Sequence, residues 1–380
     1  MEIKDLRQKI DAIDVELCKL FSERMKAVAH VAGYKRENSV HMYDNQREKE
    51  ILARISKNLG SELEAYGRTL YHTLFDLSHS YETRLIELKT PLFVKLSELI
   101  HSTPVPFPKR ATVACQGCEG AYSQIAADRL FEMPEIMFNN TFDGVFRAVS
   151  GGLCEYGILP IENSSTGSVN EVYDLLVKYN VSIVRSLRVK TDHALLVLPG
   201  TELKDIKIIY SHHQAIGQCS QFLDSLKDVR IIPCENTAVA ARNVALGGDK
   251  THASLSSRIC AELYGLKILT SNIQNRDNNY TRFICISRES KIFPGADRTS
   301  IMMVIPNKPG TLFQVLSKFN AIGANLVKLE SRPVPNKDFE FIFYFDIEAS
   351  VYDERFTALI CQLETNGEQF KYFGTYSEVF

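Results

Sequence analysis

The first ninety residues carry apolar side chains at helical spacing. Between Leu6 and Lys35 the apolar residues recur every three or four positions, or at multiples of that spacing, which places them on one face of a long amphipathic helix. Similar patterns cover residues 45–58 and 62–88, and the Gly60-Ser61 pair between them predicts a break. We therefore expect an all-helical domain over residues 1–90.

A different pattern follows a proline-rich stretch. Residues 102–108 hold three prolines, which lack a backbone donor and end a helix, so we expect a linker over 91–108. From Arg110 onward, short apolar runs alternate with helical stretches, which is typical of an α/β domain, placed here at 109–288. Its expected strands are 111–115, 156–161, 181–189, 193–198, 206–210, 229–233 and 283–287.

The C-terminal part has a third pattern. It contains an apolar run at 300–305, a helical stretch at 312–322, and phenylalanines at every second position from Phe339 to Phe345. Strict alternation is expected of a strand with one buried face. Residues 297–380 should therefore form a small α+β domain, an antiparallel sheet with helices on one face.

Composition and charge exclude several classes of protein. With 380 residues, 45% of them hydrophobic, the chain can bury two or three cores, since single cores stop growing at about 250–300 residues. A net charge of −2 gives no broad positive field for nucleic acid or anionic membranes. The N-terminus is charged, and no apolar run approaches the roughly 18 residues of a membrane helix, so we expect a cytoplasmic protein.

The cysteines and glycines exclude common cofactor sites. Nine cysteines, an odd number, fit reduced thiols better than disulfides. Cys115 and Cys118 form a CxxC without a second pair or a histidine at ligand spacing, so we expect no metal. The sequence contains no GxGxxG and no P-loop, which argues against a dinucleotide-dependent dehydrogenase.

Three cations lie along the first helix. Arg24 and Lys35 are eleven residues apart, almost three turns, and so share a face at a separation of about 16 Å. Both side chains could reach one ligand between them. Arg7 lies about 25 Å from Arg24 along the same helix, so a functional Arg7 must serve a site in a partner subunit. The alternative is that all three are solvated surface charges.

Further polar residues extend this set in a fixed order. Asp44, Arg47 and Glu48 share one helix face, as do Ser78 and Glu82. With the three cations they resemble the all-helical class of chorismate mutase over residues 4–88. The resemblance implies an intertwined dimer, in which Arg24 and the other chain's Arg7 bind the two carboxylates of chorismate. It also assigns Arg47, Asp44 and Ser78 to substrate binding, Lys35 to the ether oxygen and Glu48 to the ring hydroxyl.

The chemistry of the rearrangement suits these residue types. It needs a held conformation and stabilisation of the charge that grows on the ether oxygen, so Lys35 and Glu82 are the catalytic candidates and no cofactor is required. The family usually has glutamine where Glu82 stands. A carboxylate there would repel the developing charge, so Glu82 must act protonated, as a donor. A competing register aligns Ser80 and Arg84 instead.

Three turns in the central domain lead into helical patterns and could present backbone N–H groups to an anion, or simply cap the helices. They are Gly117–Ser123, Glu162–Ser168 and Ser211–Gln214. Together with Asn279–Phe283 they resemble prephenate dehydratase over residues 110–287. This implies two α/β lobes, as in a type II periplasmic binding protein, with the substrate between them. By resemblance, Thr281 is the catalytic residue, and the site is lined by Glu162, Asn163, Ser164, Ser211, His212 and Gln218.

The dehydratase reaction expels hydroxide and carbon dioxide. A threonine hydroxyl is too weak an acid to protonate hydroxide, so we expect Thr281 to donate a hydrogen bond to the leaving oxygen while another group supplies the proton. His212 and Glu162 both remain candidates for that group.

The C-terminal strings Asn307–Phe313, Gly323–Leu326 and Glu330–Pro333 resemble the ferredoxin-like ACT regulatory domain, although they also suit ordinary β-α-β turns. Thr311 stands where the family usually has alanine. Its hydroxyl, beside an apolar pocket, would change the affinity for the ligand. The resemblance implies L-phenylalanine bound at a dimer interface by Gly310, Thr311, Leu312, Asn325, Glu330, Ser331 and Arg332.

The order of the three parts is similar to that of the bifunctional chorismate mutase–prephenate dehydratase family over nearly all 380 residues. It implies a homodimeric enzyme that converts chorismate to prephenate and then to phenylpyruvate, under feedback control by L-phenylalanine. The rival hypothesis is a non-catalytic sensor of an aromatic metabolite. Thr281 and the full set of helical cations would be superfluous in such a sensor.

Overall fold

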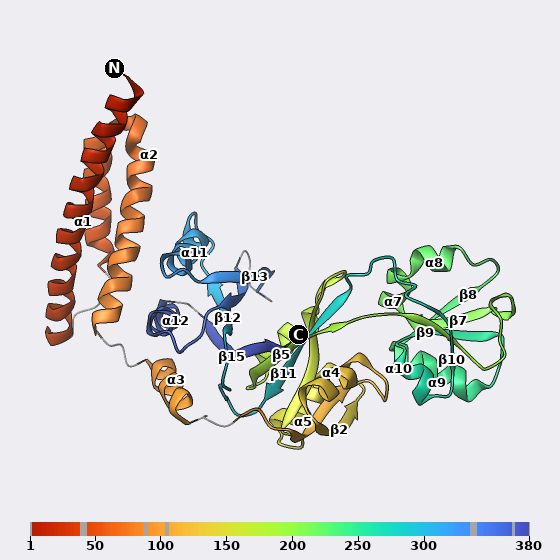
Figure 1. Ribbon diagram of the computed structural model, residues 1–380. Helices are drawn as coiled ribbons and strands as arrows, with labels where there is room; N and C mark the ends of the chain where they lie inside the picture. Colours follow the sequence, from red (N-terminus) through yellow and green to blue (C-terminus); the bar gives the residue numbers. More distant parts are fainter. Residues whose placement is uncertain are drawn as a thin grey trace. The chain divides into compact units, whose positions relative to one another are not determined.

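The computed structural model describes residues 2–38, 44–86, 90–102, 106–334, 340–366 and 369–379. The chain folds as two compact units (Figure 1). The first unit comprises residues 1–100 and 301–371, and the second comprises 101–300 and 372–380. In the described ranges, no helix combines the length and apolarity needed to cross a membrane.

Two long helices form the N-terminal part of the first unit. Helix α1 (Ile3–Asn38) packs along α2 (Asn45–Ile86). The break predicted at Gly60 is confirmed: this residue has φ 69° and ψ 170°, a conformation that glycine adopts without steric cost. The stretch expected to be a linker contains α3 (Pro91–Ser102). Pro91 could have indicated this helix, because proline is favoured as the first residue of a helix.

Helix α1 buries little of its apolar face within this chain. Ala32 is its one buried residue in the described range, because α2 covers only part of the stripe. The leucines and isoleucines nearer the N-terminus remain 40–63% exposed, namely Leu6, Ile10, Ile13, Leu17 and Leu20. A stripe of this kind is normally covered in the folded protein.

The remainder of the first unit has the element order β-α-β-β-α-β, which is the ferredoxin-like arrangement. Its strands lie in the order β13-β14-β12-β15, and its core holds the fully buried Phe319, Phe345 and Ile360. Of the alternating phenylalanines, Phe339 lies outside the described residues. The elements are β12 (Arg298–Ile305), α11 (Thr311–Ala321), β13 (Asn325–Pro333), β14 (Phe341–Glu348), α12 (Glu354–Asn366) and β15 (Phe370–Val379).

The second unit has two α/β lobes, as predicted. The larger sheet runs β15-β5-β11-β3-β1-β2, with β4 beside β3 and with residues 372–379 of β15 at one edge. Helices α4 (Tyr122–Leu130), α5 (Phe142–Ser150) and α6 (Asn170–Lys178) belong to this lobe. Its strands are β1 (Arg110–Gln116), β2 (Met133–Asn139), β3 (Tyr156–Asn163), β4 (Gly167–Ser168), β5 (Ser182–Lys190) and β11 (Tyr280–Ser287).

The smaller lobe has the strand order β10-β6-β9-β7-β8. The chain crosses between the lobes twice, after β5 and again before β11. The strands are β6 (Ala194–Val197), β7 (Ile208–His212), β8 (Arg230–Cys234), β9 (His252–Ser256) and β10 (Lys267–Ser271), and the helices are η1 (Leu203–Asp205), α7 (His213–Gln218), α8 (Ser220–Asp224), α9 (Thr237–Gly247) and α10 (Ile259–Leu263).

All seven strands expected in the central domain are present, and four others, β2, β4, β9 and β10, had not been predicted. Strand β4 is only two residues long. Strand β2 contains Pro134, which is typical of an edge strand, and β10 is also an edge strand. Strand β9 reads His-Ala-Ser-Leu-Ser, with small polar residues in place of the β-branched ones that mark most strands. Its serines are nevertheless buried, because the sheet is covered on both faces.

Candidate active sites

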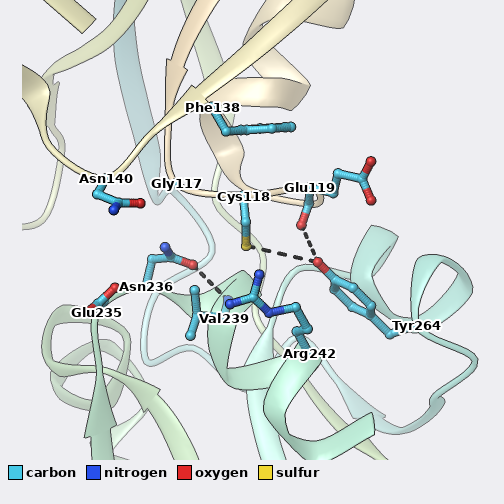
Figure 2. A pocket seen from close by; sticks show the side chains of 10 residues that line it. All are labelled: Gly117, Cys118, Glu119, Phe138, Asn140, Glu235, Asn236, Val239, Arg242 and Tyr264. Carbon is cyan, nitrogen blue, oxygen red and sulfur yellow. Dashed lines mark hydrogen bonds between the residues drawn. The ribbon is translucent and has the colours of Figure 1, made fainter. Parts of the chain in front are cut away.

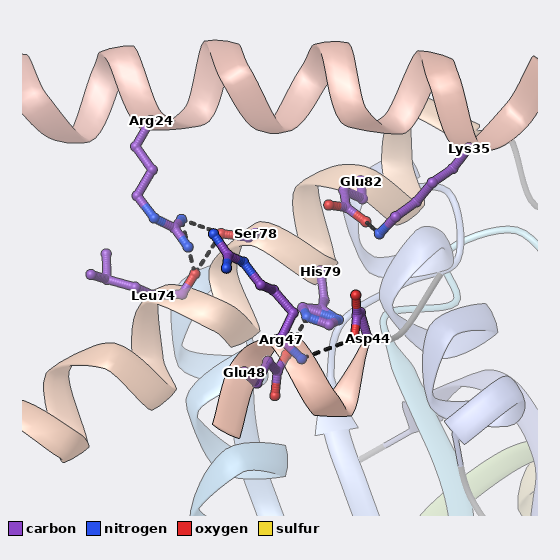
Figure 3. A network of polar contacts seen from close by, with 9 residues as sticks. All are labelled: Arg24, Lys35, Asp44, Arg47, Glu48, Leu74, Ser78, His79 and Glu82. Atoms are coloured by element: carbon purple, nitrogen blue, oxygen red, sulfur yellow. Dashed lines mark hydrogen bonds and ion pairs between the residues drawn. The ribbon is translucent and has the colours of Figure 1, made fainter. Parts of the chain in front are cut away.

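Facing side chains of α1 and α2 form the first candidate site (Figure 3). The Arg24 guanidinium donates to the Ser78 hydroxyl and, at 3.3 Å, to the Leu74 carbonyl. Three turns further along α1, Lys35 Nζ lies 2.9 Å from Glu82 Oε2, and their side chains are only 15% and 8% exposed. Arg24 and Lys35 therefore each lie opposite a predicted partner on α2.

The side chains of Ser78 and Glu82 both point toward α1. In the competing register, the side chain of Arg84 lies outside the described residues. Arg7 is exposed near the opposite end of α1, about five turns from Arg24. It takes no part in this site within one chain.

The start of α2 contributes three more of the predicted residues. Asp44 accepts a hydrogen bond from the Arg47 backbone N–H at 2.9 Å and so caps the helix. The Arg47 side chain is 60% exposed. Glu48 Oε1 lies 2.8 Å from Nε2 of His79, a residue that sequence reasoning had missed, because it lies 31 positions away on α2 and its partner follows only from the helix packing.

The pKa values of Glu48 and His79 are shifted in opposite directions. Burial raises the pKa of Glu48, with further contributions from Asp76 and Asp44 and an opposing one from Lys35. Burial, helped by nearby cations, lowers the pKa of His79 to about 4. The imidazole is therefore neutral near pH 7, and its Nε2–H donates to the Glu48 carboxylate.

The second candidate site is centred on Thr281, near the start of β11. In the sheet Thr281 lies opposite Asn163 of β3 and Val189 of β5. Asn163 Nδ2 donates to Thr281 Oγ1 at 3.0 Å, and the Thr191 hydroxyl oxygen also lies 3.0 Å away. Because the Thr281 oxygen accepts from the amide, its own hydrogen can be donated either to Thr191 or to a ligand.

A network of amides fixes the orientation of Asn163. Its Oδ1 accepts from the backbone N–H of Ser165 at 2.9 Å and from Gln218 Nε2 at 3.4 Å. Asn279 Nδ2 donates to Gln218 Oε1 at 3.0 Å. His193 Nε2 lies 2.9 Å from the same oxygen and is buried, which lowers the pKa of His193. Neither His193 nor Thr191 was predicted as a site residue, because His193 stands at the start of an expected strand and Thr191 lies between two expected strands, outside any motif.

Glu162, another predicted residue, forms an ion pair with Arg282: its Oε2 is 3.4 Å from Nε of Arg282. Ser164 braces its own turn, donating to the Asn278 carbonyl and accepting from the Tyr280 N–H, both at 2.9 Å. Ser211 is fully buried and donates to the Leu255 carbonyl at 2.9 Å. Its side chain therefore supports the end of β7 instead of lining a pocket.

A pocket of about 440 Å³ adjoins the amide network. Gln218 belongs to both, and of the two neighbouring histidines His213, not His212, lines the pocket. His212 packs on the His213 ring at 4.1 Å between centroids, and burial lowers the pKa of His212 to about 4. The lining residues are Ser165, Thr166, His213, Gln214, Gly217, Gln218, Gln274, Asn275, Arg276 and Asn279.

A second pocket, of about 420 Å³, lies between the loop after β1 and the start of α9 (Figure 2). Gly120 has φ +83°, and a Cβ on it would lie 2.7 Å from Cys260 Sγ. Only glycine allows this close approach of the lobes. The pocket is lined by Gly117, Cys118, Glu119, Phe138, Asn140, Glu235, Asn236, Val239, Arg242 and Tyr264.

Side chains around this second pocket tie the two lobes together. Tyr264 donates from its hydroxyl to the Glu119 carbonyl at 2.7 Å, and the Tyr122 hydroxyl donates to the Asp192 carbonyl at 2.6 Å. Burial raises the pKa of Cys118 and of Cys115, which favours the neutral thiol in both. In the described ranges, no cluster of three or more histidine, cysteine or acidic side chains could hold a metal ion.

The predicted effector residues lie at the turn before α11 and on strand β13 of the first unit. Gly310 has φ +86°, and Leu312 follows it on α11. The Thr311 hydroxyl donates to the carbonyls of Pro306 and Lys308 at 2.7 and 2.9 Å, so this hydroxyl is satisfied inside its own turn. On β13, Asn325 Nδ2 donates to Glu348 Oε2 at 2.7 Å. On the same strand Glu330 pairs with Lys328 at 3.3 Å, and Ser331 and Arg332 follow.

Comparison with known proteins finds two enzyme families in the chain. A family model described as chorismate mutase type II matches residues 6–83, and one described as prephenate dehydratase matches residues 113–291. The bifunctional chorismate mutase/prephenate dehydratase of Enterobacter agglomerans is 32% identical over 381 residues, which cover 98% of this chain and 95% of the relative.

Solved structures resemble 70% of the chain. Prephenate dehydratase of Arthrobacter aurescens in complex with L-Phe has a TM-score of 0.64 at 27% identity and covers 70% of this chain and 89% of its own. GqqA, described as a novel type of quorum quenching acylase, also has a TM-score of 0.64, at 30% identity, and covers 70% of this chain and 98% of its own. The chain belongs to the family of bifunctional chorismate mutase/prephenate dehydratases and carries both enzyme domains.

Proposed function

We propose that the α1–α2 site rearranges chorismate to prephenate and that the Thr281 site converts prephenate to phenylpyruvate. The observation that carries this proposal is the convergence of residues distant in sequence. Lys35 meets Glu82 and Arg24 meets Ser78 in one unit, while Thr281 meets Asn163 in the other. A non-catalytic sensor would have no use for either arrangement.

At the mutase site, Arg24 and Arg47 bind the carboxylates of chorismate, and Lys35 stabilises the charge that develops on the ether oxygen. In the free protein Lys35 is held by Glu82 at 2.9 Å. The substrate's ether oxygen therefore enters between a cation and an acid, and only the protonated acid helps the reaction. The His79 N–H keeps Glu48 in place for the ring hydroxyl.

At the dehydratase site, Asn163 donates to the Thr281 oxygen and so polarises the O–H bond toward the leaving hydroxyl. His212 has a pKa of about 4 and is not an imidazolium near pH 7, which disfavours it as the proton source. Its neighbour His213 lines the pocket and takes its place as the histidine candidate. Glu162, paired with Arg282, remains the alternative.

The apolar stripe of α1 supports a homodimer. Leu6, Ile10 and Ile13 are 40–63% exposed, and they flank Arg7, which is about 25 Å from Arg24. A second copy packed on this stripe would cover it and bring its own Arg7 to the carboxylates. The mutase sites are then shared between chains.

The turn around Gly310 supports an ACT regulatory domain that binds L-phenylalanine. Its backbone N–H groups begin α11, and the neighbouring strand β13 is an edge strand with Val327 39% and Leu329 43% exposed. A related dehydratase was solved with L-Phe bound. The effector acts by binding the less active state more tightly than the active one.

The first prediction concerns Thr281. Thr281→Ala removes the donor at the leaving hydroxyl, so prephenate turnover should fall about 100-fold or more, while chorismate consumption stays unchanged. Prephenate should then accumulate from chorismate in a coupled assay. Thr281→Ser keeps the hydroxyl and should retain most turnover. Normal phenylpyruvate formation by Thr281→Ala would contradict the assignment.

The second prediction concerns Glu82. Only a protonated Glu82 can donate a hydrogen bond to the ether oxygen, whereas glutamine is a donor at every pH. Mutase activity should therefore depend less on pH in Glu82→Gln than in the parent, with no change in the dehydratase profile. Identical mutase profiles for Glu82→Gln and the parent would refute the role.

The third prediction tests shared mutase sites. Arg7→Ala and Lys35→Ala should each abolish most mutase activity. A heterodimer of the two has one intact site, so mixing and subunit exchange should restore about one quarter of the parental activity. No recovery after verified exchange would mean that Arg7 serves no neighbouring site.

The fourth prediction concerns L-phenylalanine. Gly310→Ala strains a backbone with φ +86° and should weaken inhibition by phenylalanine about tenfold or more, while both turnovers persist. Gly295→Ala is the matched control, since Gly295 has φ +82° and equally open surroundings. A point variant is preferable to truncation, because residues 372–379 belong to the dehydratase unit. Unchanged inhibition in Gly310→Ala would place the effector elsewhere.

A further inference from the structure

The last strand of the chain is built into the sheet that carries Thr281. Residues Ser377–Val379 of β15 pair in parallel with Arg185–Leu187 of β5. A Cβ on Gly374 would lie 2.1 Å from the Ile183 carbonyl oxygen, so only glycine permits this approach of the two backbones. The C-terminal strand is therefore an integral part of the dehydratase unit.

Strand β15 carries a buried carboxylate, that of Glu378. The Glu378 side chain is 1% exposed, and its Oε2 lies 3.0 Å from Arg188 Nε and 3.2 Å from Arg298 Nη1. The Ser186 hydroxyl donates to Oε1 at 3.4 Å. A carboxylate at this depth is stable only with cationic partners. Arg298 is 10% exposed and depends on the carboxylate in return, whereas Arg188 is 45% exposed.

Arg188 contacts Glu378 on one side and faces β11, the strand of Thr281, on the other. In the sheet Arg188 lies directly opposite Arg282, and Val189 lies opposite Thr281. Arg282 in turn lies opposite Glu162 and pairs with it at 3.4 Å. Two like charges directly opposite one another weaken strand pairing. Glu378 neutralises Arg188, and Glu162 neutralises Arg282. Arg282 is the residue next to Thr281 on β11.

We propose that Glu378 is a positioning residue for prephenate dehydration. By neutralising Arg188 it preserves the β5–β11 register that sets Thr281 opposite Val189 and close to Thr191. The inference rests on the proposed role of Thr281. Loss of the Glu378 charge loosens this register, so the Thr281 hydroxyl is misplaced in the transition state while substrate binding changes little.

The experiment measures kcat and KM for prephenate, and mutase activity, in full-length Glu378→Gln. We expect kcat to fall about tenfold with KM and mutase activity nearly unchanged. Adding Arg188→Met to Glu378→Gln removes the repelling cation and should restore kcat to within about threefold of the parent. Adding Arg298→Met instead should restore thermal stability but not kcat.

The matched control is Glu132→Gln, which removes an exposed carboxylate that pairs with Lys109 in the same unit and should leave kcat unchanged. Parental kcat in Glu378→Gln, or a loss that Arg188→Met deepens, would overturn the inference. If Glu378→Gln does not fold, the same test can be made with Glu378→Asp, alone and combined with Arg188→Met. The expected fall in kcat is then smaller. Absence of prephenate turnover in the parent would instead contradict the proposed function.

Discussion

The antiparallel register of β11 between β3 and β5 decides which side chains meet at the dehydratase site. It brings Thr281 to Asn163 and Val189, and Arg282 to Glu162 and Arg188. A slip of one residue would turn Thr281 to the other face and bring the Arg282 charge into its place. A shift in the β3 pairing follows directly after Arg282, and such irregularities commonly direct side chains beside active sites. The amide network and the charges on either side act to preserve this register.

The helical site depends on a different constraint, the spacing along α1. Eleven residues separate Arg24 from Lys35, so both face α2 and each meets its own partner there. The same rigid spacing keeps Arg7 away from them. In the proposed dimer, one helix supplies two cations to one site and a third to another, and a second chain packs on the exposed apolar stripe beside Arg7. Both activities thus rest on backbone geometry that holds polar groups in advance of the substrate.

Features set by local pattern could be predicted from the sequence, and features set by distant contacts could not. The helical periodicity of α1, the break at Gly60 and the apolar runs of β3, β5 and β11 are local signals. The pairing of His79 with Glu48, of His193 with Gln218 and of β15 with β5 arises only after packing. The motif around Ser211 was predicted to line the site, yet its buried hydroxyl bonds the Leu255 carbonyl, because the pattern does not distinguish a ligand contact from a bond within the fold.

The central claim is that one chain carries both reactions in sequence. Its most direct test is incubation of the purified, full-length protein with chorismate alone, while chorismate, prephenate and phenylpyruvate are followed over time. The account predicts that chorismate disappears, prephenate passes through a maximum and phenylpyruvate accumulates without any added cofactor. Chorismate that persists, or prephenate that accumulates without forming phenylpyruvate, would contradict it.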